Sequence, residues 1–181
     1  VQMFALLAQF GDHLAAPPIG FDQFRSGIPN VDEDPVIGNV MDGAGGPNGV
    51  PFPDHLNNAE MWTPPQGVSP RLNAFLFYEK DKYAALDPVD DASVIYHEYT
   101  HGLVGRTVVD ALGWGATSLR QPWALNEGLA DFFSLDYLVG RGLMADTDAP
   151  GEVWIGPHLF KPGVGRKEAI DCPIAVLQSN C

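Results

Sequence analysis

The chain has 181 residues, of which 45% are hydrophobic and 10% aromatic, so it can bury a sizeable core and is not a disordered polypeptide. Lysine and arginine number 10 against 23 aspartate and glutamate, which gives a formal net charge of -13 at pH 7. This acidic balance argues against nucleic acid or an anionic membrane as the main partner, because both bind basic faces. No apolar run approaches the roughly 18 residues that a membrane-spanning helix requires.

The first half of the chain predicts one helix followed by loops and short strands. Residues 1–16 carry apolar side chains at helical spacing and end before two prolines, which predicts a helix. Residues 19–70 are rich in Gly, Pro, Asn and Asp, a composition typical of loops with short strands. The run at 72–78 is rich in β-favouring residues and predicts a strand.

Two further helices are predicted in the second half. Asp90 or Asp91 can cap the first of them, which stops near Gly105. The second runs from about residue 122 to 140, between a proline suited to a first turn and a glycine suited to a C-terminal stop. Residues 141–181 are again rich in glycine and proline and predict no long helix.

The first of these two helices carries an HExxH motif, in which His97 and His101 flank Glu98. Positions i and i+4 lie on one helical face, so both imidazoles can reach a single Zn²⁺ ion. Glu98 projects beside the metal, where it can take a proton from metal-bound water instead of ligating the ion. The motif therefore predicts two zinc ligands and a general base.

The second helix carries Glu127 and Asp131, again at positions i and i+4. A catalytic zinc uses three protein ligands and keeps one position open, so Glu127 is the expected third ligand. Asp131 is expected to accept a hydrogen bond from the outer nitrogen of a ligand histidine. The alternative is an amphipathic helix with two solvated acids beside a core helix that carries histidines. The joint occurrence of the two motifs favours a metal site.

Together these motifs resemble the fungalysin-type (M36) zinc metallopeptidases of the gluzincin clan. HEYTHG at 97–102 and NEGLADFF at 126–133 carry the resemblance, and TPPQGVSPR at 63–71 is similar to a segment of that family. The resemblance covers roughly residues 1–140. It implies an α+β, zincin-like (thermolysin-like) catalytic domain that contains the HExxH active-site helix.

The resemblance also implies a function. It implies a secreted, zinc-dependent endopeptidase, made as a proenzyme with a propeptide, that hydrolyses peptide or protein substrates through a metal-activated water. The expected organisation is one domain over 1–181, with a mixed lobe at 1–91, zinc-binding helices at 92–140 and an irregular segment at 141–181.

The predicted strand would correspond to the edge strand that binds substrate backbone in this clan. Asn73 and Ala74 are the candidate substrate-binding residues on it, by resemblance to an Asn-Ala-Phe segment of thermolysin-like enzymes. A free edge suits an extended peptide, because its unpaired N–H and C=O groups bond to any sequence. An ordinary internal strand is the alternative.

The chain departs from the family after the second helix, where the C-terminal helical lobe is expected to be short or missing. That lobe supplies a histidine that stabilises the oxyanion, and His158 is the one later histidine, either in that role or as a surface residue. An inactive or incomplete zinc-binding homologue that serves as a protein-interaction module is therefore an alternative function. A purely structural domain without metal is a third.

Two smaller features leave alternatives open. Cys172 and Cys181 form either a mutual disulfide, which suits an oxidising compartment, or a pair of unrelated thiols. The acidic cluster at 32–34 is either a Ca²⁺ site or a solvated loop, and it lacks EF-hand spacing.

Overall fold

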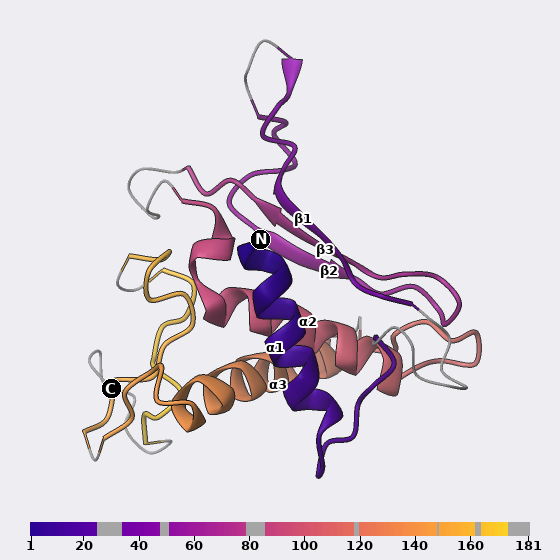
Figure 1. Cartoon of the computed structure of the whole chain (residues 1–181). Coiled ribbons are helices and arrows are strands. Elements are labelled where there is room, and N and C mark those ends of the chain that lie inside the picture. Colours follow the sequence, from indigo (N-terminus) through magenta and orange to yellow (C-terminus); the bar gives the residue numbers. More distant parts are fainter. Residues whose placement is uncertain are drawn as a thin grey trace.

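A computed structural model describes residues 1–24, 34–47, 51–78, 86–117, 120–147, 149–161 and 164–173 (Figure 1). The described residues include three α-helices, a three-stranded sheet and a short 3-10 helix. In chain order the elements are α1 (Gln2–Ala15), β1 (Ile37–Asp42), β2 (Ala59–Trp62), β3 (Arg71–Phe75), η2 (Pro88–Asp90), α2 (Ala92–Thr107) and α3 (Arg120–Gly140). This mixture of helices and a small sheet agrees with the predicted α+β class.

The three predicted helices are confirmed, and their observed ends lie within two residues of the expected ones. The predicted strand is also present as β3, although regular pairing stops at Phe75 and continues only as isolated bridges at Leu76 and Phe77. The described residues beyond α3 form no helix, as expected from their composition. No helix in the described part of the chain is long and apolar enough to cross a membrane.

The sheet has the order β1-β3-β2, with β1 parallel and β2 antiparallel to β3. Asn73 therefore lies between Asn39 of β1 and Glu60 of β2, and Ala74 pairs with Ala59 and is completely buried. The prediction that β3 is an edge strand is wrong, because strands on both sides already use its backbone hydrogen-bonding groups. The edge next to the helices is β2 instead.

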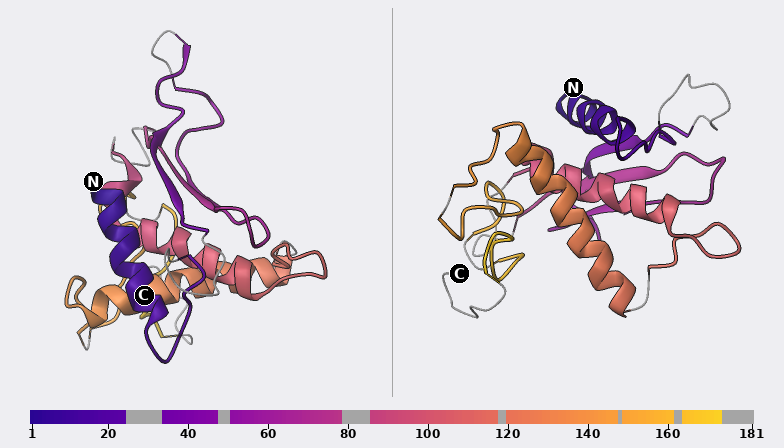
Figure 2. Two further views of the ribbon diagram at one scale, coloured as in Figure 1. Left: turned by 45° about the vertical axis from the view of Figure 1, so that its right-hand side comes forward. Right: turned by 90° about the horizontal axis from the view of Figure 1, so that it is seen from below.

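Helix α2 occupies the centre of the fold. It packs against α3 on one side and β2 on another, and α1 crosses in front of it in Figure 1. The view from below in Figure 2 shows α3 running across α2 on the side away from the sheet. Nearly all of α2 is buried; its Tyr96 ring stacks on Phe10 of α1 with centroids 4.6 Å apart. The HExxH motif therefore lies on a helix fixed from three directions.

The start of α2 is fixed by a buried hydrogen-bond network. Asp91 caps the helix by accepting a hydrogen bond from the Ser93 N–H at 3.1 Å, as the sequence predicted. The same carboxylate accepts from the His158 N–H at 2.8 Å, and the Ser93 hydroxyl accepts from the Gly156 N–H at 2.8 Å. These bonds tie the irregular segment after α3 to the first turn of α2.

Gly102 allows β2 to approach α2 closely. A Cβ atom at this position would lie 2.5 Å from Met61 Cε and 2.7 Å from Phe24 Cε2, which is too close for real atoms. The glycine that follows the HExxH motif therefore leaves room for the side chains of Met61 and Phe24 against α2.

Candidate metal centre

Three side chains from α2 and α3 converge at one point, with their ligand atoms within 4.8 Å of one another. His97 and His101 lie one turn apart on α2, and their Nε2 atoms are 3.0 Å apart. Glu127 approaches from α3, with Oε2 3.5 Å from His97 Nε2 and Oε1 3.4 Å from His101 Nε2. Among the described residues, no other group of His, Cys, Asp or Glu side chains has this arrangement.

These distances fit a tetrahedral metal ion. Ligand atoms about 2.0–2.1 Å from a tetrahedral Zn²⁺ lie about 3.3 Å from each other, close to the three observed separations. Two imidazole nitrogens and a carboxylate oxygen are also a donor set that zinc takes at catalytic sites, where a fourth position stays open. His97, His101 and Glu127 could therefore hold a zinc ion.

Asp131 orients His97 through the ring nitrogen that does not face the other candidate ligands. Its Oδ1 lies 2.8 Å from His97 Nδ1, so the Nδ1–H donates to the carboxylate and Nε2 keeps its lone pair for a metal. Arg166, from the segment after α3, donates to Asp131 Oδ2 from Nε at 2.7 Å and to Glu127 Oε2 from Nη2 at 2.9 Å. Arg166 thus joins the carboxylate of a candidate ligand to the carboxylate that orients another.

The pKa values reflect this network of charges in the metal-free protein. Burial alone would lower the pKa of His97, but hydrogen bonds with Asp131 and Glu127 raise it to about 9. Burial would raise the pKa values of Glu127 and Asp131, but hydrogen bonds with the histidines, and with Arg166 at Asp131, lower both. A proton on His97 competes with a metal for the same nitrogen, so metal binding releases it.

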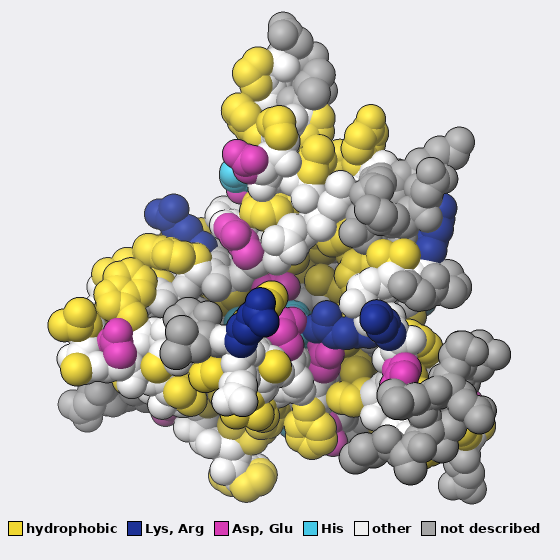
Figure 3. All heavy atoms as spheres, turned by 180° about the vertical axis from the view of Figure 1, so that it is seen from behind, with side chains coloured by type: hydrophobic (Ala, Val, Ile, Leu, Met, Phe, Trp, Pro, Cys, Tyr) yellow, Lys and Arg dark blue, Asp and Glu magenta, His cyan; other side chains and the backbone are white. Residues whose placement is uncertain are grey.

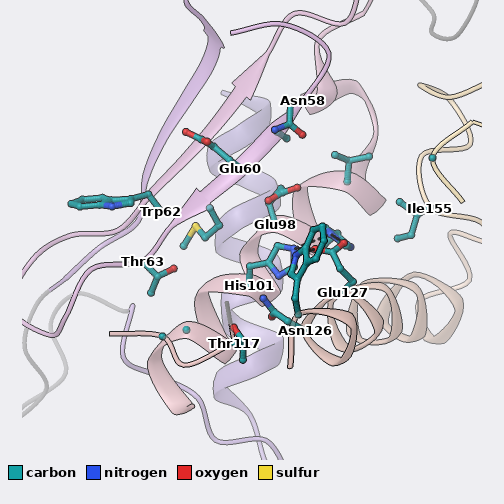
Figure 4. Close-up of a pocket in the computed structure, with 18 of the residues that line it drawn as sticks. Asn58, Glu60, Trp62, Thr63, Glu98, His101, Thr117, Asn126, Glu127 and Ile155 are labelled. Carbon is teal, nitrogen blue, oxygen red and sulfur yellow. Dashed lines mark hydrogen bonds and ion pairs between the residues drawn. The ribbon is translucent and has the colours of Figure 1, made fainter. Parts of the chain in front are cut away.

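Glu98 lies beside the cluster without belonging to it. It is 8% exposed, and burial raises the pKa of its carboxyl group. In Figure 4 its carboxylate lies between the strand that carries Glu60 and the side chain of His101. A carboxylate in this position can exchange protons with a water held at the cluster.

The cluster lies on the floor of a cleft of about 680 Å³ between β2 and α3. Asn58, Glu60 and Trp62 come from the sheet side, and Asn126 and Glu127 from α3 (Figure 4). Seen from behind, charged and histidine side chains gather at the middle of the molecule, with hydrophobic side chains around them (Figure 3). The cleft therefore has charged and histidine side chains at its centre, and both polar and apolar side chains line its walls.

Three buried polar atoms on side chains that line this cleft have no hydrogen-bond partner among the described residues, namely His101 Nδ1, Asn126 Oδ1 and Thr63 Oγ1. Figure 4 shows the Asn126 side chain next to His101. The outer nitrogen of His101 is thus less firmly held than that of His97, which bonds to Asp131.

The structure brings together five of the residues that the sequence singled out: His97, Glu98, His101, Glu127 and Asp131. Asn73 and Ala74 lie in the central strand and do not line the cleft. His158 is exposed and does not line it either, which agrees with the surface alternative.

The two remaining predictions concern segments of which the structure describes only some residues. In the acidic cluster at 32–34, only Asp34 is described; it is buried and accepts hydrogen bonds from Arg106 at 3.2 Å and from the Gly67 N–H at 2.7 Å. The predicted pairing of Cys172 with Cys181 lies outside the described residues.

Two residues that contact Glu127 were not predicted from the sequence. They are Arg166 and Trp123. Arg166 lies in an irregular segment with no motif around it. Trp123 precedes Glu127 by four residues, so the helical spacing could have indicated it; its Nε1–H donates to Glu127 Oε1 at 3.1 Å.

Comparison with known proteins identifies the same family that the sequence motifs resemble. Residues 18–157 match the family model described as fungalysin metallopeptidase (M36). The extracellular metalloproteinase MEP of Pyricularia oryzae is 30% identical over 138 residues, which are 76% of this chain and 20% of that protein. The protein of the same name from Leptosphaeria maculans is 32% identical over 122 residues, which are 67% of this chain and 17% of the relative.

A third relative, extracellular metalloproteinase 2 of Phaeosphaeria nodorum, is 28% identical over 135 residues, which are 75% of this chain and 19% of that protein. The matched stretch is thus about a fifth of the length of each of these relatives. The family match over residues 18–157 includes the HExxH helix and the start of the segment that follows α3. On the strength of the family match and these relatives, the chain belongs to the fungalysin (M36) family of metallopeptidases.

Proposed function

We propose that this chain is the zinc-binding part of a secreted endopeptidase that hydrolyses peptide bonds through a metal-activated water. The observation that carries the proposal is the convergence of His97, His101 and Glu127 on the floor of a cleft, beside the buried carboxylate of Glu98. Its family and the names of its relatives, which are extracellular metalloproteinases, support the same conclusion.

The candidate metal ligands and the glutamate beside them define where peptide hydrolysis would occur. A Zn²⁺ ion held by His97, His101 and Glu127 would supply a water of lowered pKa and polarise the scissile carbonyl. Glu98 would take a proton from the attacking water and pass it to the leaving amine. Burial raises the pKa of its carboxyl group, which makes the group a stronger proton acceptor than an exposed glutamate.

Strand β2 is the surface we propose for the substrate backbone. It forms one wall of the cleft, and among the described strands only β3 pairs with it. Because antiparallel bonds alternate and the Phe75 N–H donates to the Asn58 carbonyl, the N–H and C=O groups of Ala59 and Met61 point away from β3. An extended peptide could pair with these free groups and lie across the cluster.

Further properties that the family resemblance implies are also part of this proposal. We propose a zincin-like arrangement of one domain over 1–181. We also propose that the precursor carries a propeptide. Mass spectrometry of the secreted protein and of its precursor tests the propeptide, because removal would leave a new N-terminus.

One observation favours the alternative, an incomplete zinc-binding homologue that acts as a protein-interaction module. Among the described residues that line the cleft, His97 and His101 are the only histidines. If both bind the metal, no other described imidazole of the cleft is available to stabilise an oxyanion.

The deciding experiment is cleavage of a mixed library of quenched peptides by the purified protein, with and without a zinc chelator. We expect chelator-sensitive cleavage that the Glu98→Gln variant loses while it still binds zinc. Glu168→Gln is the matched control, since Glu168 is exposed and does not line the cleft. Zinc binding without cleavage would favour the interaction module, and absence of zinc binding would refute both.

A further inference from the structure

The indole of Trp123 contacts the candidate ligand Glu127 directly. Trp123 lies one helical turn before Glu127 on α3, on the same face, and its Nε1–H donates to Glu127 Oε1 at 3.1 Å. The side chain is 58% exposed and lines the cleft. A tryptophan that buries so little of its ring gains little from packing, so this hydrogen bond is the specific contact that the structure gives it.

With this bond, each oxygen of the Glu127 carboxylate has its own donor. Oε1 accepts from Trp123, and Oε2 accepts from Arg166 Nη2 at 2.9 Å. The same two oxygens lie 3.4 Å from His101 Nε2 and 3.5 Å from His97 Nε2, respectively. The orientation of the carboxylate plane therefore decides how the third ligand faces the other two.

Arg166 alone leaves this orientation under-determined. Its guanidinium also donates to Asp131, from Nε at 2.7 Å and from Nη2 at 3.0 Å, so its Nη2 is shared between two carboxylates. The terminal torsion of a glutamate is intrinsically soft, and a single shared donor on Oε2 does not fix the position of Oε1. The Trp123 N–H supplies the second point of attachment.

We propose that Trp123 is a positioning residue of the metal centre, which holds Oε1 of Glu127 in place from the wall of the cleft. This inference rests on the metal site of the proposed function. Groups that hydrogen-bond to metal ligands typically change metal affinity about 10–100-fold when they are removed. Loss of the indole donor should therefore weaken zinc binding by about tenfold or more.

The test compares Trp123→Phe with Trp114→Phe in the full chain. Phenylalanine keeps an aromatic ring but removes the N–H donor and part of the indole, and the control substitution removes the same atoms. Trp114 is the matched control, because it is also a half-exposed tryptophan of the cleft, and the structure shows no bond from its side chain to the three candidate ligands in the part it describes. Zn²⁺ affinity is measured by competition with a chromophoric chelator, and the ligand field by the visible absorption of bound Co²⁺.

We expect Trp123→Phe to bind Zn²⁺ about tenfold or more weakly and to shift the Co²⁺ bands, whereas Trp114→Phe does neither. Addition of Zn²⁺ should also change the tryptophan fluorescence of the wild type and of Trp114→Phe, but not that of Trp123→Phe. A Trp123→Phe protein with unchanged affinity and an unchanged Co²⁺ spectrum would refute this inference and leave the metal site standing. A wild type that binds neither ion would overturn both.

Discussion

Arg166 donates from Nε to Asp131 Oδ2 at 2.7 Å, although the two residues lie 35 positions apart in the chain. Asp131 in turn lies 2.8 Å from His97 Nδ1, so a residue of the irregular segment after α3 acts on a candidate zinc ligand through one carboxylate. Hydrogen bonding to Asp131 is also the main reason why the pKa of Arg166 is raised. The segment that follows α3 is therefore part of the metal centre.

Replacement of Asp131 tests this connection. We expect Asp131→Ala to lower the affinity for Zn²⁺ about 10–100-fold, since His97 loses its acceptor and Arg166 loses a partner. The measurement is competition with a chromophoric chelator at neutral pH. Asp136→Ala is the control, because it removes a carboxylate from an exposed position of the same helix. Equal affinities for the two variants would contradict the assigned role of Asp131.

Removal of the metal should lower the stability of the fold. The three ligand side chains come from two helices that meet only in the folded state, so bound zinc stabilises that state by mass action, about 2.7 kcal/mol when free zinc is 100 times its dissociation constant. Thermal unfolding with excess zinc and with excess chelator measures the effect. Glu98→Gln should retain the difference, whereas His101→Ala should lose it. Identical midpoints for the wild type in both conditions would argue against a bound ion.

The two helices that carry the candidate zinc ligands could be predicted because their signals are local. Asp91 caps α2 through its neighbour Ser93, and the positions of His97 and His101 follow from the geometry of any α-helix. The approach of Glu127 required only that α2 and α3 pack against each other. Motif spacing and helix geometry therefore indicated most of the candidate site.

The edge strand and Arg166 could not be predicted, because both depend on long-range contacts. The alternation of buried Leu72 and Ala74 with Asn73 is compatible with an edge strand or a central one, and only pairing with β1 and β2 decides between them. Arg166 reaches Asp131 from a segment with no periodic pattern. A chain without regular local structure gives no indication of where its side chains will lie.

Gly102 offers a test of the packing between α2 and β2. Alanine favours helices over glycine by up to about 1 kcal/mol, but a Cβ here meets Met61 and Phe24, and overpacking of this kind costs about 1–3 kcal/mol. We therefore expect Gly102→Ala to be destabilised overall in urea unfolding. Gly128→Ala is the matched control, since no atom lies within 4 Å of its added Cβ, and it should be as stable as the wild type or more so. A stabilised Gly102→Ala would show that β2 does not pack this closely.

Asp171 should make the stability of the C-terminal segment depend on pH. Burial would raise the pKa of its carboxyl group, but N–H groups of Glu152, Val153 and Gly151 donate to it at 3.0, 3.3 and 2.9 Å and lower the pKa below 3.8. A carboxylate with a lowered folded pKa stabilises the protein fully above its unfolded pKa. This stabilisation is lost as the pH falls through the folded pKa.

The measurement is the free energy of unfolding of the wild type and of Asp171→Asn between pH 7 and the acid limit of the fold. We expect the wild type to be more stable at neutral pH, by an amount that stays constant down to about pH 5. The difference should shrink as the pH falls below 3.8, because the wild-type carboxylate then takes up a proton on unfolding. Other acidic groups titrate alike in both proteins and cancel in the difference. A gap that persists or widens in acid would mean that the three N–H groups do not depend on the charge of Asp171.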